Sequence, residues 1–304
     1  MIGCLMTVAP SNGARTWSAG GALALQAVRH AVAAACHRRE CGHMSNAVRE
    51  GVVDEERPPT GQVAVFIDFE NLVLGAGKGL PGQANPVPYA ALARLCREYG
   101  NASVRRAYAD WADQRFGRYQ HDLALNGVDM TQVGRFGAQA KNAADIQMAV
   151  DAMETLIVHP DVTVFVLVTG DSDYTPLVRR LREFGKWVVG VGTEATASRR
   201  LSSVCSEYKF WGTLVAEVDP AARAAVDAAF DIAAAEQLLV RAFEETARTT
   251  LTASAIKGKM VALDSSFDER NYGCRSFRDF LDRFPARVRR AGRSGSDITL
   301  ELIR

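Results

Sequence analysis

The sequence predicts an α/β protein: a parallel sheet flanked by helices, followed by a small C-terminal winged-helix domain. From Gln62 onward, strand-like and helix-like segments alternate, as they do in sheets built from repeated strand–helix units. The apolar runs 63–67 and 162–168 are rich in the β-branched residues of buried parallel strands. Residues 232–304 change to helices followed by two strands, which is the element order of a winged helix.

In the first part, periodicity predicts five strands separated by helices. The strands are expected at 63–68, 102–108, 130–133, 162–168 and 187–192. The helices are expected at 88–99, 116–126, 143–158, 174–184 and 198–204. The first of these has apolar side chains at three- and four-residue spacing, and Gly127 and Gly185 follow two others, where glycine often ends a helix.

The C-terminal part has its own pattern. An Ala-rich helical stretch at 219–235 bridges the two parts. Three helices are then expected at 234–247, 252–261 and 276–284, and two strands at 288–290 and 298–303. A turn at 292–295, with glycine at both ends, would join the strands into a hairpin.

A chain of 304 residues favours two domains. We expect a poorly ordered N-terminal extension at 1–60, a first domain at 61–215, a helical linker at 216–231 and a second domain at 232–304. The extension lacks the order of charged, apolar and small residues that marks a signal peptide. Translation starting at Met44 is an equally good explanation for the earlier residues.

Composition narrows the class of protein. No apolar run reaches the length of about 18 residues that suggests a membrane helix, so none is expected. The six cysteines form no closely spaced pair of the kind that binds zinc, and the chain is too long for a disulfide scaffold. These observations favour a reducing compartment, and we expect a cytoplasmic protein.

Charge is unevenly distributed along the chain. Residues 61–230 carry 17 basic and 19 acidic side chains, whereas residues 270–304 carry 9 basic and 4 acidic ones. The body is therefore nearly neutral, and the C-terminal segment has five positive charges in excess. This distribution favours a polyanionic partner for the second domain.

Four acidic residues lie where predicted strands give way to loop or helix: Asp68, Asp145, Asp171 and Asp173. The carboxyl ends of parallel strands meet at one edge of a sheet, where open α/β folds bind ligands. Carboxylates that converge there repel one another unless a cation offsets their charge. Oxygen ligands suit Mg²⁺ or Mn²⁺, so the sequence predicts a divalent metal site.

Each acid also has a plainer explanation. Asp and Asn are common where loops begin and at helix N-caps, which would explain Asp68 and Asn71. An acid such as Asp145 in the first turn of a helix interacts favourably with the helix dipole whatever its function. Asp171 could belong to a turn, and Asp173 could cap the next helix. In the metal site, we expect Asp171 to be a direct ligand and Asp173 to be a ligand or to lie beside the ligands. Asp151 is six residues beyond Asp145, about 120° around a helix, and is less expected in the site.

Four segments carry a family resemblance: VFIDFENL, KNAADIQMAVD, VLVTGDSDYTPLVRRLREFGKWVVGVG and SRRLSSVCSEYKFW. Together they resemble the NYN domain, which has a PIN-like nuclease fold, over residues 62–212. Each motif is short, but four in the right order form a specific set. The resemblance implies a metal-dependent ribonuclease whose site residues are Asp68, Asn71, Asp145, Thr169, Asp171 and Asp173. The resemblance often includes an acid at the position of Asp151 as well.

These groups suggest a mechanism for cleaving an RNA phosphodiester bond. A divalent ion held by Asp68, Asp145 and Asp171 could activate a water and bind a non-bridging phosphate oxygen, with a second ion about 4 Å away. Asn71 and Thr169 would orient the water or the phosphate. Lys141 could pair with a phosphate. Further basic residues could line the RNA path, although each could equally be a solvated surface group: Arg115, Arg135, Arg199 and Arg200.

The segment ASAIKGKMVALDSSFDERNYGCRSFRDFLDRFP resembles the OST-HTH/LOTUS domain, and the match extends over residues 232–304. The resemblance implies a module that binds RNA or protein. Its densest basic group is Arg287, Arg289 and Arg290, which we expect to contact phosphates. A winged helix that binds a protein partner remains the alternative.

The sequence therefore predicts a Mg²⁺- or Mn²⁺-dependent ribonuclease acting on single-stranded RNA, with an appended RNA-binding winged helix. One alternative is a catalytically silent RNA-binding or scaffold protein with the same fold. Retention of four clustered acids argues against it, because unused like charges destabilise a fold. A phosphatase or a DNA-directed 5′-nuclease is a further alternative, although no feature specific to DNA is visible.

Overall fold

The computed structural model describes residues 58–79, 87–134, 143–246 and 250–303, and every structural statement below refers to them. The N-terminal extension, with Met44 as a possible start, lies outside the described residues apart from its last three positions. No helix in the described ranges is both long and apolar enough to cross a membrane.

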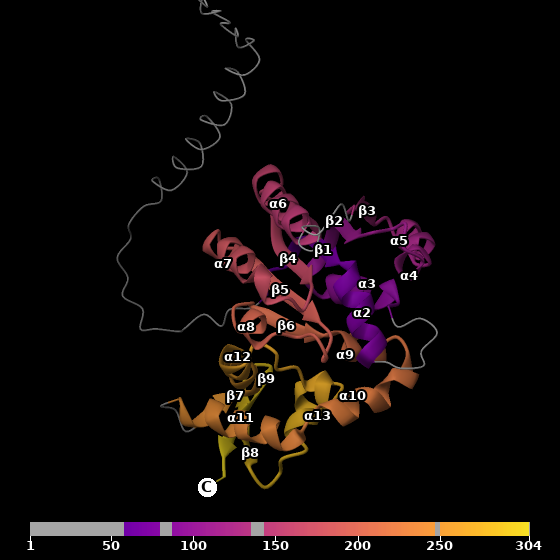
Figure 1. Ribbon diagram of the computed structural model, residues 1–304. Coiled ribbons are helices and arrows are strands. Elements are labelled where there is room, and N and C mark those ends of the chain that lie inside the picture. Colours follow the sequence, from indigo (N-terminus) through magenta and orange to yellow (C-terminus); the bar gives the residue numbers. More distant parts are fainter. Residues whose placement is uncertain (1–57, 80–86, 135–142, 247–249, 304) are drawn as a thin grey trace, which may run out of the picture. The chain divides into compact units, whose positions relative to one another are not determined.

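The first part is built on a six-stranded parallel sheet (Figure 1). Its strands lie in the order β3-β2-β1-β4-β5-β6. Their bounds are β1 Gly61–Asp68, β2 Gly100–Ala109, β3 Asp129–Gln132, β4 Val162–Val168, β5 Trp187–Gly192 and β6 Glu207–Phe210. The two most apolar strands, β1 and β4, pair with each other at the centre, so the residues that follow them lie side by side at one edge.

Helices cover both faces of this sheet (Figure 1). They are α2 Phe69–Gly79, α3 Tyr89–Tyr99, α4 Gln114–Gly117, α5 Gln120–Leu125, α6 Ala143–Val158, α7 Thr175–Glu183, α8 Arg199–Ser202 and α9 Trp211–Ala216. Alternate β1 residues belong to different hydrophobic clusters: Val65 packs with residues of α3 and α9, and Phe66 with residues of α6 and α7. The predicted α/β fold class is confirmed.

Three parts of this domain differ from the expectation. No helix was predicted directly after β1, but α2 begins at once and packs Phe69 against Trp111 and Tyr119. The expected helix at 116–126 is two short helices, α4 and α5. Strand β6 was not predicted, because its sequence, Glu-Tyr-Lys-Phe, alternates charge with apolar residues like an exposed segment although Glu207 and Lys209 are buried.

The second part contains the short 3-10 turn η3 Pro220–Ala222, the linker helix α10 Arg223–Ala229 and a small domain. The domain consists of α11 Ile232–Glu244, β7 Thr250–Thr252, α12 Ala253–Leu263, the 3-10 turn η4 Glu269–Tyr272, α13 Phe277–Leu281, β8 Val288–Ser294 and β9 Asp297–Leu302. Its antiparallel sheet has the order β7-β9-β8, and β7 was not predicted. The expected turn at 292–295 was placed too early, because β8 continues to Ser294 after an irregularity between Arg290 and Gly292.

The expected helix at 219–235 is interrupted. Helix α10 ends at Ala229, and Phe230 adopts an extended conformation with φ −120° and ψ 126°. Asp231 then caps α11 by accepting a hydrogen bond from the backbone N–H of Ala233. The chain therefore enters the second domain through a defined break rather than through a continuous helix.

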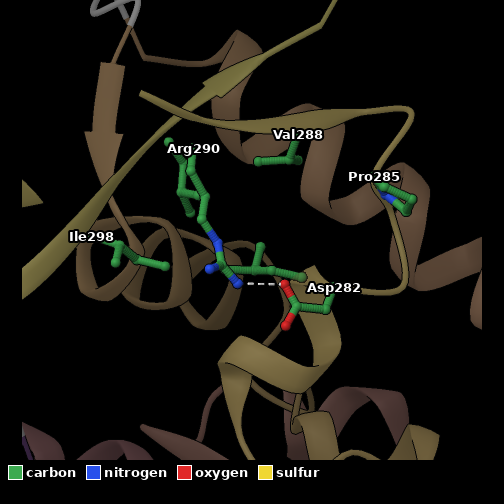
Figure 2. Close-up of a pocket in the computed structure, with 7 residues that line it drawn as sticks. Asp282, Pro285, Val288, Arg290 and Ile298 are labelled. Carbon is green, nitrogen blue, oxygen red and sulfur yellow. Dashed lines mark hydrogen bonds and ion pairs between the residues drawn. The ribbon is translucent and has the colours of Figure 1, made fainter. Parts of the chain in front are cut away.

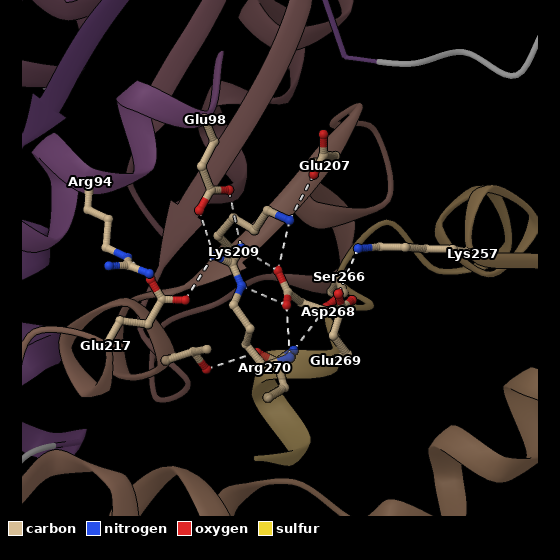
Figure 3. Close-up of polar contacts among 12 residues, drawn as sticks. Arg94, Glu98, Glu207, Lys209, Glu217, Lys257, Ser266, Asp268, Glu269 and Arg270 are labelled. Atoms are coloured by element: carbon tan, nitrogen blue, oxygen red, sulfur yellow. Dashed lines mark hydrogen bonds and ion pairs between the residues drawn. The ribbon is translucent and has the colours of Figure 1, made fainter. Parts of the chain in front are cut away.

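Residues 265–271 of the second part contact the first part through both neutral and ionic interactions (Figure 3). The backbone N–H of Tyr208 donates to the carbonyl of Ser265 at 2.7 Å, and the Thr213 hydroxyl donates to Asn271 Oδ1 at 2.8 Å. At the centre, Lys209 Nζ lies 2.8 Å from Glu207 and 2.9 Å from Asp268.

The ionic contact continues outward from Asp268. Arg270 pairs with Asp268 at 2.7 Å, with Glu217 at 2.9 Å and with Glu98 at 2.6 Å. Burial alone would lower the pKa of Lys209, but the charges of Asp268 and Glu207 hold that pKa well above its ordinary value. Burial would raise the pKa of Asp268, but Lys209 and Arg270 hold it far below its ordinary value. These groups therefore remain charged because they are paired.

Candidate active site

Asp68 is the last residue of β1 and is buried, with 6% of its surface exposed. Its Oδ1 accepts a hydrogen bond from the backbone N–H of Asn71 at 3.0 Å, and its Oδ2 accepts one from the Thr169 hydroxyl at 3.4 Å. The first of these bonds caps the start of α2, so the capping role considered for Asp68 is present. Asp68 is thereby held in one orientation at the carboxyl edge of the sheet.

The loop that follows β4 lies beside Asp68. The Thr169 hydroxyl accepts a hydrogen bond from the backbone N–H of Asp171 at 3.1 Å, so Thr169 links Asp68 to Asp171. Asn71 Oδ1 accepts from the backbone N–H of Gly170 at 3.1 Å. A Cβ at position 170 would lie 2.4 Å from the carbonyl oxygen of Thr196, so only glycine fits there.

Asp171 and Asp173 differ in their surroundings. Asp171 Oδ1 accepts from the backbone N–H of Asp173 at 2.9 Å, and Asp171 thereby caps the 3-10 turn η2 Ser172–Tyr174. The capping role considered for Asp173 therefore belongs to Asp171. The Asp173 side chain is exposed at the edge of the group.

Asp145 lies in the first turn of α6 and accepts a 2.8 Å hydrogen bond from the Tyr174 hydroxyl. Burial raises its pKa, the bond from Tyr174 opposes that rise, and the charges of Asp171 and Asp173 add to it. Burial likewise raises the pKa of Asp68 to about 7, with a further contribution from the charge of Asp145. The four predicted acids therefore interact as one electrostatic group.

Two residues of this region were not predicted as site residues. Glu70 lies two positions after Asp68, and its charge adds to the raised pKa of both Asp68 and Asp145. Its Oε1 accepts a hydrogen bond from the backbone N–H of Asp110 at 2.9 Å. Glu70 was missed because no helix was predicted where α2 begins. Tyr174 was missed because its sequence context is that of an ordinary core aromatic.

Asp151, which was less expected in the site, has protein partners of its own. It accepts a 2.7 Å hydrogen bond from the Tyr108 hydroxyl and another of 2.7 Å from the Gln147 amide. Arg106 lies 3.3 Å from the same carboxylate. Asp151 is therefore a buried acid whose charge is offset by protein groups.

The described basic residues among those expected along the RNA path lie on two different helices, α4 and α8. Arg115 pairs with Asp113 at 2.6 Å, whereas Arg199 and Arg200 are exposed on α8 and make no ion pair with any described residue. Arg135 and Lys141 lie outside the described residues.

We call Arg287, Arg289 and Arg290 the wing arginines. Each is already paired with an acid: Arg287 with Glu236 at 2.6 Å, Arg289 with Glu301 at 2.9 Å and Arg290 with Asp282 at 2.7 Å. Figure 2 shows the last pair across a hollow lined by apolar residues of α13 and the hairpin. A second set, Arg275, Arg278 and Arg283, is exposed and forms no ion pair among the described residues; we call these the unpaired arginines.

The acidic group suits a divalent cation that keeps several of its water ligands better than a cation bound directly by three or more side chains. In the described ranges, no three His, Cys, Asp or Glu side chains are arranged as a complete metal-ligand cluster. Mg²⁺, however, keeps several waters and is often bound by only one or two carboxylates together with substrate phosphates. The donors are all oxygens, and among the described residues no cation lowers the raised pKa values of Asp68 and Asp145. Asp68, Asp145 and Asp171 would hold such a cation directly or through water.

The raised pKa of Asp68 makes stability depend on pH in the absence of metal. Asp68 titrates near its ordinary 3.8 when unfolded and at about 7 when folded, so the folded state binds the extra proton. Its contribution is favourable at low pH and is lost as the pH rises from about 4 to about 7. In EDTA, Asp68→Asn should remove this dependence. Urea unfolding of both proteins at pH 5 and pH 8 measures it, and an equal pH response in both would contradict the assignment.

The chain matches two known domain families. Residues 62–212 match the NYN domain, and residues 232–298 match the OST-HTH/LOTUS domain. The protein therefore combines an NYN domain, which is nuclease-like and PIN-like in fold, with a C-terminal domain of an RNA-binding family. Both resemblances expected from the sequence are confirmed.

Individual relatives add little about function. The chain is 30% identical over 104 residues to uncharacterized protein MJ0482 of Methanocaldococcus jannaschii, a match covering 33% of this chain and 43% of that protein. It thus spans less than half of that relative's length. A crystal structure of a protein of unknown function, VPA0982 from Vibrio parahaemolyticus, is 22% identical and has a TM-score of 0.43. That alignment covers 50% of this chain and 94% of the other.

Proposed function

We propose that this protein is a Mg²⁺- or Mn²⁺-dependent ribonuclease that cleaves phosphodiester bonds of single-stranded RNA. The observation that carries the proposal is Asp68, a buried carboxylate at the end of a central strand whose pKa is raised by burial and by its acidic neighbours. An acid in that position, with no countercharge among the described residues, is suited to binding a cation.

The chain's own residues have separate tasks in this proposal. Asp68, Asp145 and Asp171 hold the cation, with Asp173 and Glu70 at the margin of the group. The Thr169 hydroxyl links the Asp68 carboxylate to the backbone N–H of Asp171 by two hydrogen bonds. Asn71 Oδ1 fixes the loop after β4 by accepting a hydrogen bond from the backbone N–H of Gly170. When bound, the cation lowers the pKa of a water and offsets charge on a phosphate oxygen.

The direct test is cleavage of a labelled single-stranded RNA by the purified full chain in Mn²⁺ or Mg²⁺, with EDTA as the control. The proposal expects cleavage that depends on the metal. A specific observation favours a second candidate: the described residues form no complete ligand cluster. If the protein binds RNA but leaves it intact with either metal, a catalytically silent RNA-binding protein is the better hypothesis.

We further propose that RNA is delivered by the OST-HTH/LOTUS domain and reaches the acidic group past Arg115, Arg199 and Arg200, with Arg135 and Lys141 as additional contacts. A protein partner for the C-terminal domain is the alternative. A cytoplasmic location fits the three described cysteines, which are free and buried.

The ion pairs of the C-terminal domain lead to a prediction about RNA affinity. Replacing the three unpaired arginines with alanine should weaken RNA binding more than replacing the three wing arginines, because the wing arginines must leave an acid to bind a phosphate. For a single strand, the log–log salt slope should fall by about 0.7 for every phosphate that is no longer neutralised. Fluorescence anisotropy over a salt series compares the two triple variants, which carry the same charge change. A greater weakening by the wing-arginine variant would contradict this prediction.

A further inference from the structure

Tyr174 joins the hydrophobic core to the acidic group. Its ring is buried, with 2% of the residue exposed, in the cluster formed by α6, α7 and one face of the sheet. At the end of that ring, the hydroxyl donates to Asp145 Oδ1 at 2.8 Å. A hydroxyl buried without a partner destabilises a fold, and the partner of this one is a proposed metal ligand.

In the described ranges, Asp145 is held by one side-chain donor, whereas Asp68 has two donors and the donor to Asp171 is a backbone N–H. Asp68 accepts hydrogen bonds from Asn71 and Thr169, and Asp171 accepts from the backbone of Asp173. Among the described residues, the Tyr174 hydroxyl is the one hydrogen-bond donor to the Asp145 carboxylate. Asp145 also lies on a helix rather than at the end of a strand, so the sheet does not position it.

We propose that Tyr174 is a positioning residue: it holds one oxygen of Asp145 so that the other oxygen faces the cation. This inference rests on the proposed function. Tyr174 comes from the same loop that carries Thr169 and Asp171, so one segment of about six residues, 169–174, would orient three carboxylates from three different elements. The loop after β4 would therefore determine how all three proposed ligands are oriented.

The chain offers a matched control in Tyr108. Its ring is fully buried in the same hydrophobic cluster, and its hydroxyl donates to Asp151 Oδ2 at 2.7 Å. Asp151 is offset by Arg106 and lies outside the acidic group. Tyr174→Phe and Tyr108→Phe therefore each remove one buried tyrosine–aspartate hydrogen bond and leave the ring in place, but only the first should alter metal binding.

The experiment measures Mn²⁺ binding to the full chain by electron paramagnetic resonance of free Mn²⁺, at a temperature where circular dichroism shows each variant folded. Tyr174→Phe should weaken Mn²⁺ binding about tenfold or more, the usual effect of removing a group that orients a metal ligand. Tyr108→Phe should remain within about twofold of wild type, because Asp151 is not a ligand in this proposal. A second readout is the Mn²⁺ concentration giving half-maximal RNA cleavage, which should rise in parallel for Tyr174→Phe.

A double-mutant comparison separates positioning from general loosening of the core. In an Asp145→Asn background, Tyr174→Phe should have no further effect on Mn²⁺ affinity, because the residue acts through Asp145. Additive effects, or equal weakening in the two phenylalanine variants, would overturn the inference. If wild type and Tyr174→Phe bind Mn²⁺ with the same affinity, this inference alone is overturned. A wild-type protein that binds no Mn²⁺ would overturn the proposed function and this inference together.

Discussion

Asp68→Asn is expected to reduce RNA cleavage by at least about 100-fold, because a cation held by Asp68 contributes several kcal/mol to the transition state and about 1.4 kcal/mol corresponds to tenfold in rate. The same change should raise stability in EDTA at neutral pH, because it removes a buried carboxylate that repels its neighbours. Cleavage of labelled RNA and urea unfolding of the same samples measure both effects.

The opposite direction of these two effects distinguishes a catalytic role from a structural one. A variant that merely misfolds would lose both activity and stability. Asp129→Asn is a matched control, because Asp129 is exposed at the first residue of β3, the opposite end of a parallel strand from the site, and the charge change is the same. Asp68→Asn with near-normal cleavage would show that the acidic group is not the reaction centre.

Asp268→Ala is expected to lower the free energy of unfolding by about 3–5 kcal/mol, the usual result of removing one partner of a buried ion pair. Lys209 would keep Glu207 but lose its second carboxylate, and Arg270 would lose Asp268 but keep Glu98 and Glu217. Urea unfolding of the full chain in EDTA measures the change. The cause would be a buried cation left without sufficient countercharge rather than poorer packing.

Two comparisons sharpen this prediction. Glu183→Ala breaks the exposed pair with Arg180 and should change stability by less than about 1 kcal/mol. Replacing Lys209 with Met, Glu207 with Gln and Asp268 with Leu together should restore much of the stability that Asp268→Ala removes, because neutral side chains can replace a buried ion cluster when no charge is left unpaired. An effect of Asp268→Ala no larger than that of Glu183→Ala would show that water reaches the pair.

The sheet and most of the acidic group could be predicted from local sequence. The runs 63–67 and 162–168 predict buried strands, because they are short and rich in β-branched apolar side chains, and both form strands. The acids that follow them must then lie at the same sheet edge, since the strands are parallel. That inference needs only local pattern and the rule that parallel strands share a carboxyl edge.

Only the tertiary structure shows which charged side chains form ion pairs. Lys209 and Asp268 look like surface residues in sequence, yet they meet across 59 positions and are buried together. The wing arginines look available for phosphate, but acids from neighbouring elements already pair with them. Tyr174 looks like core until its hydroxyl is seen on Asp145. The sequence gives the type of each side chain. Whether that side chain is already paired depends on the distant residue that folding places beside it.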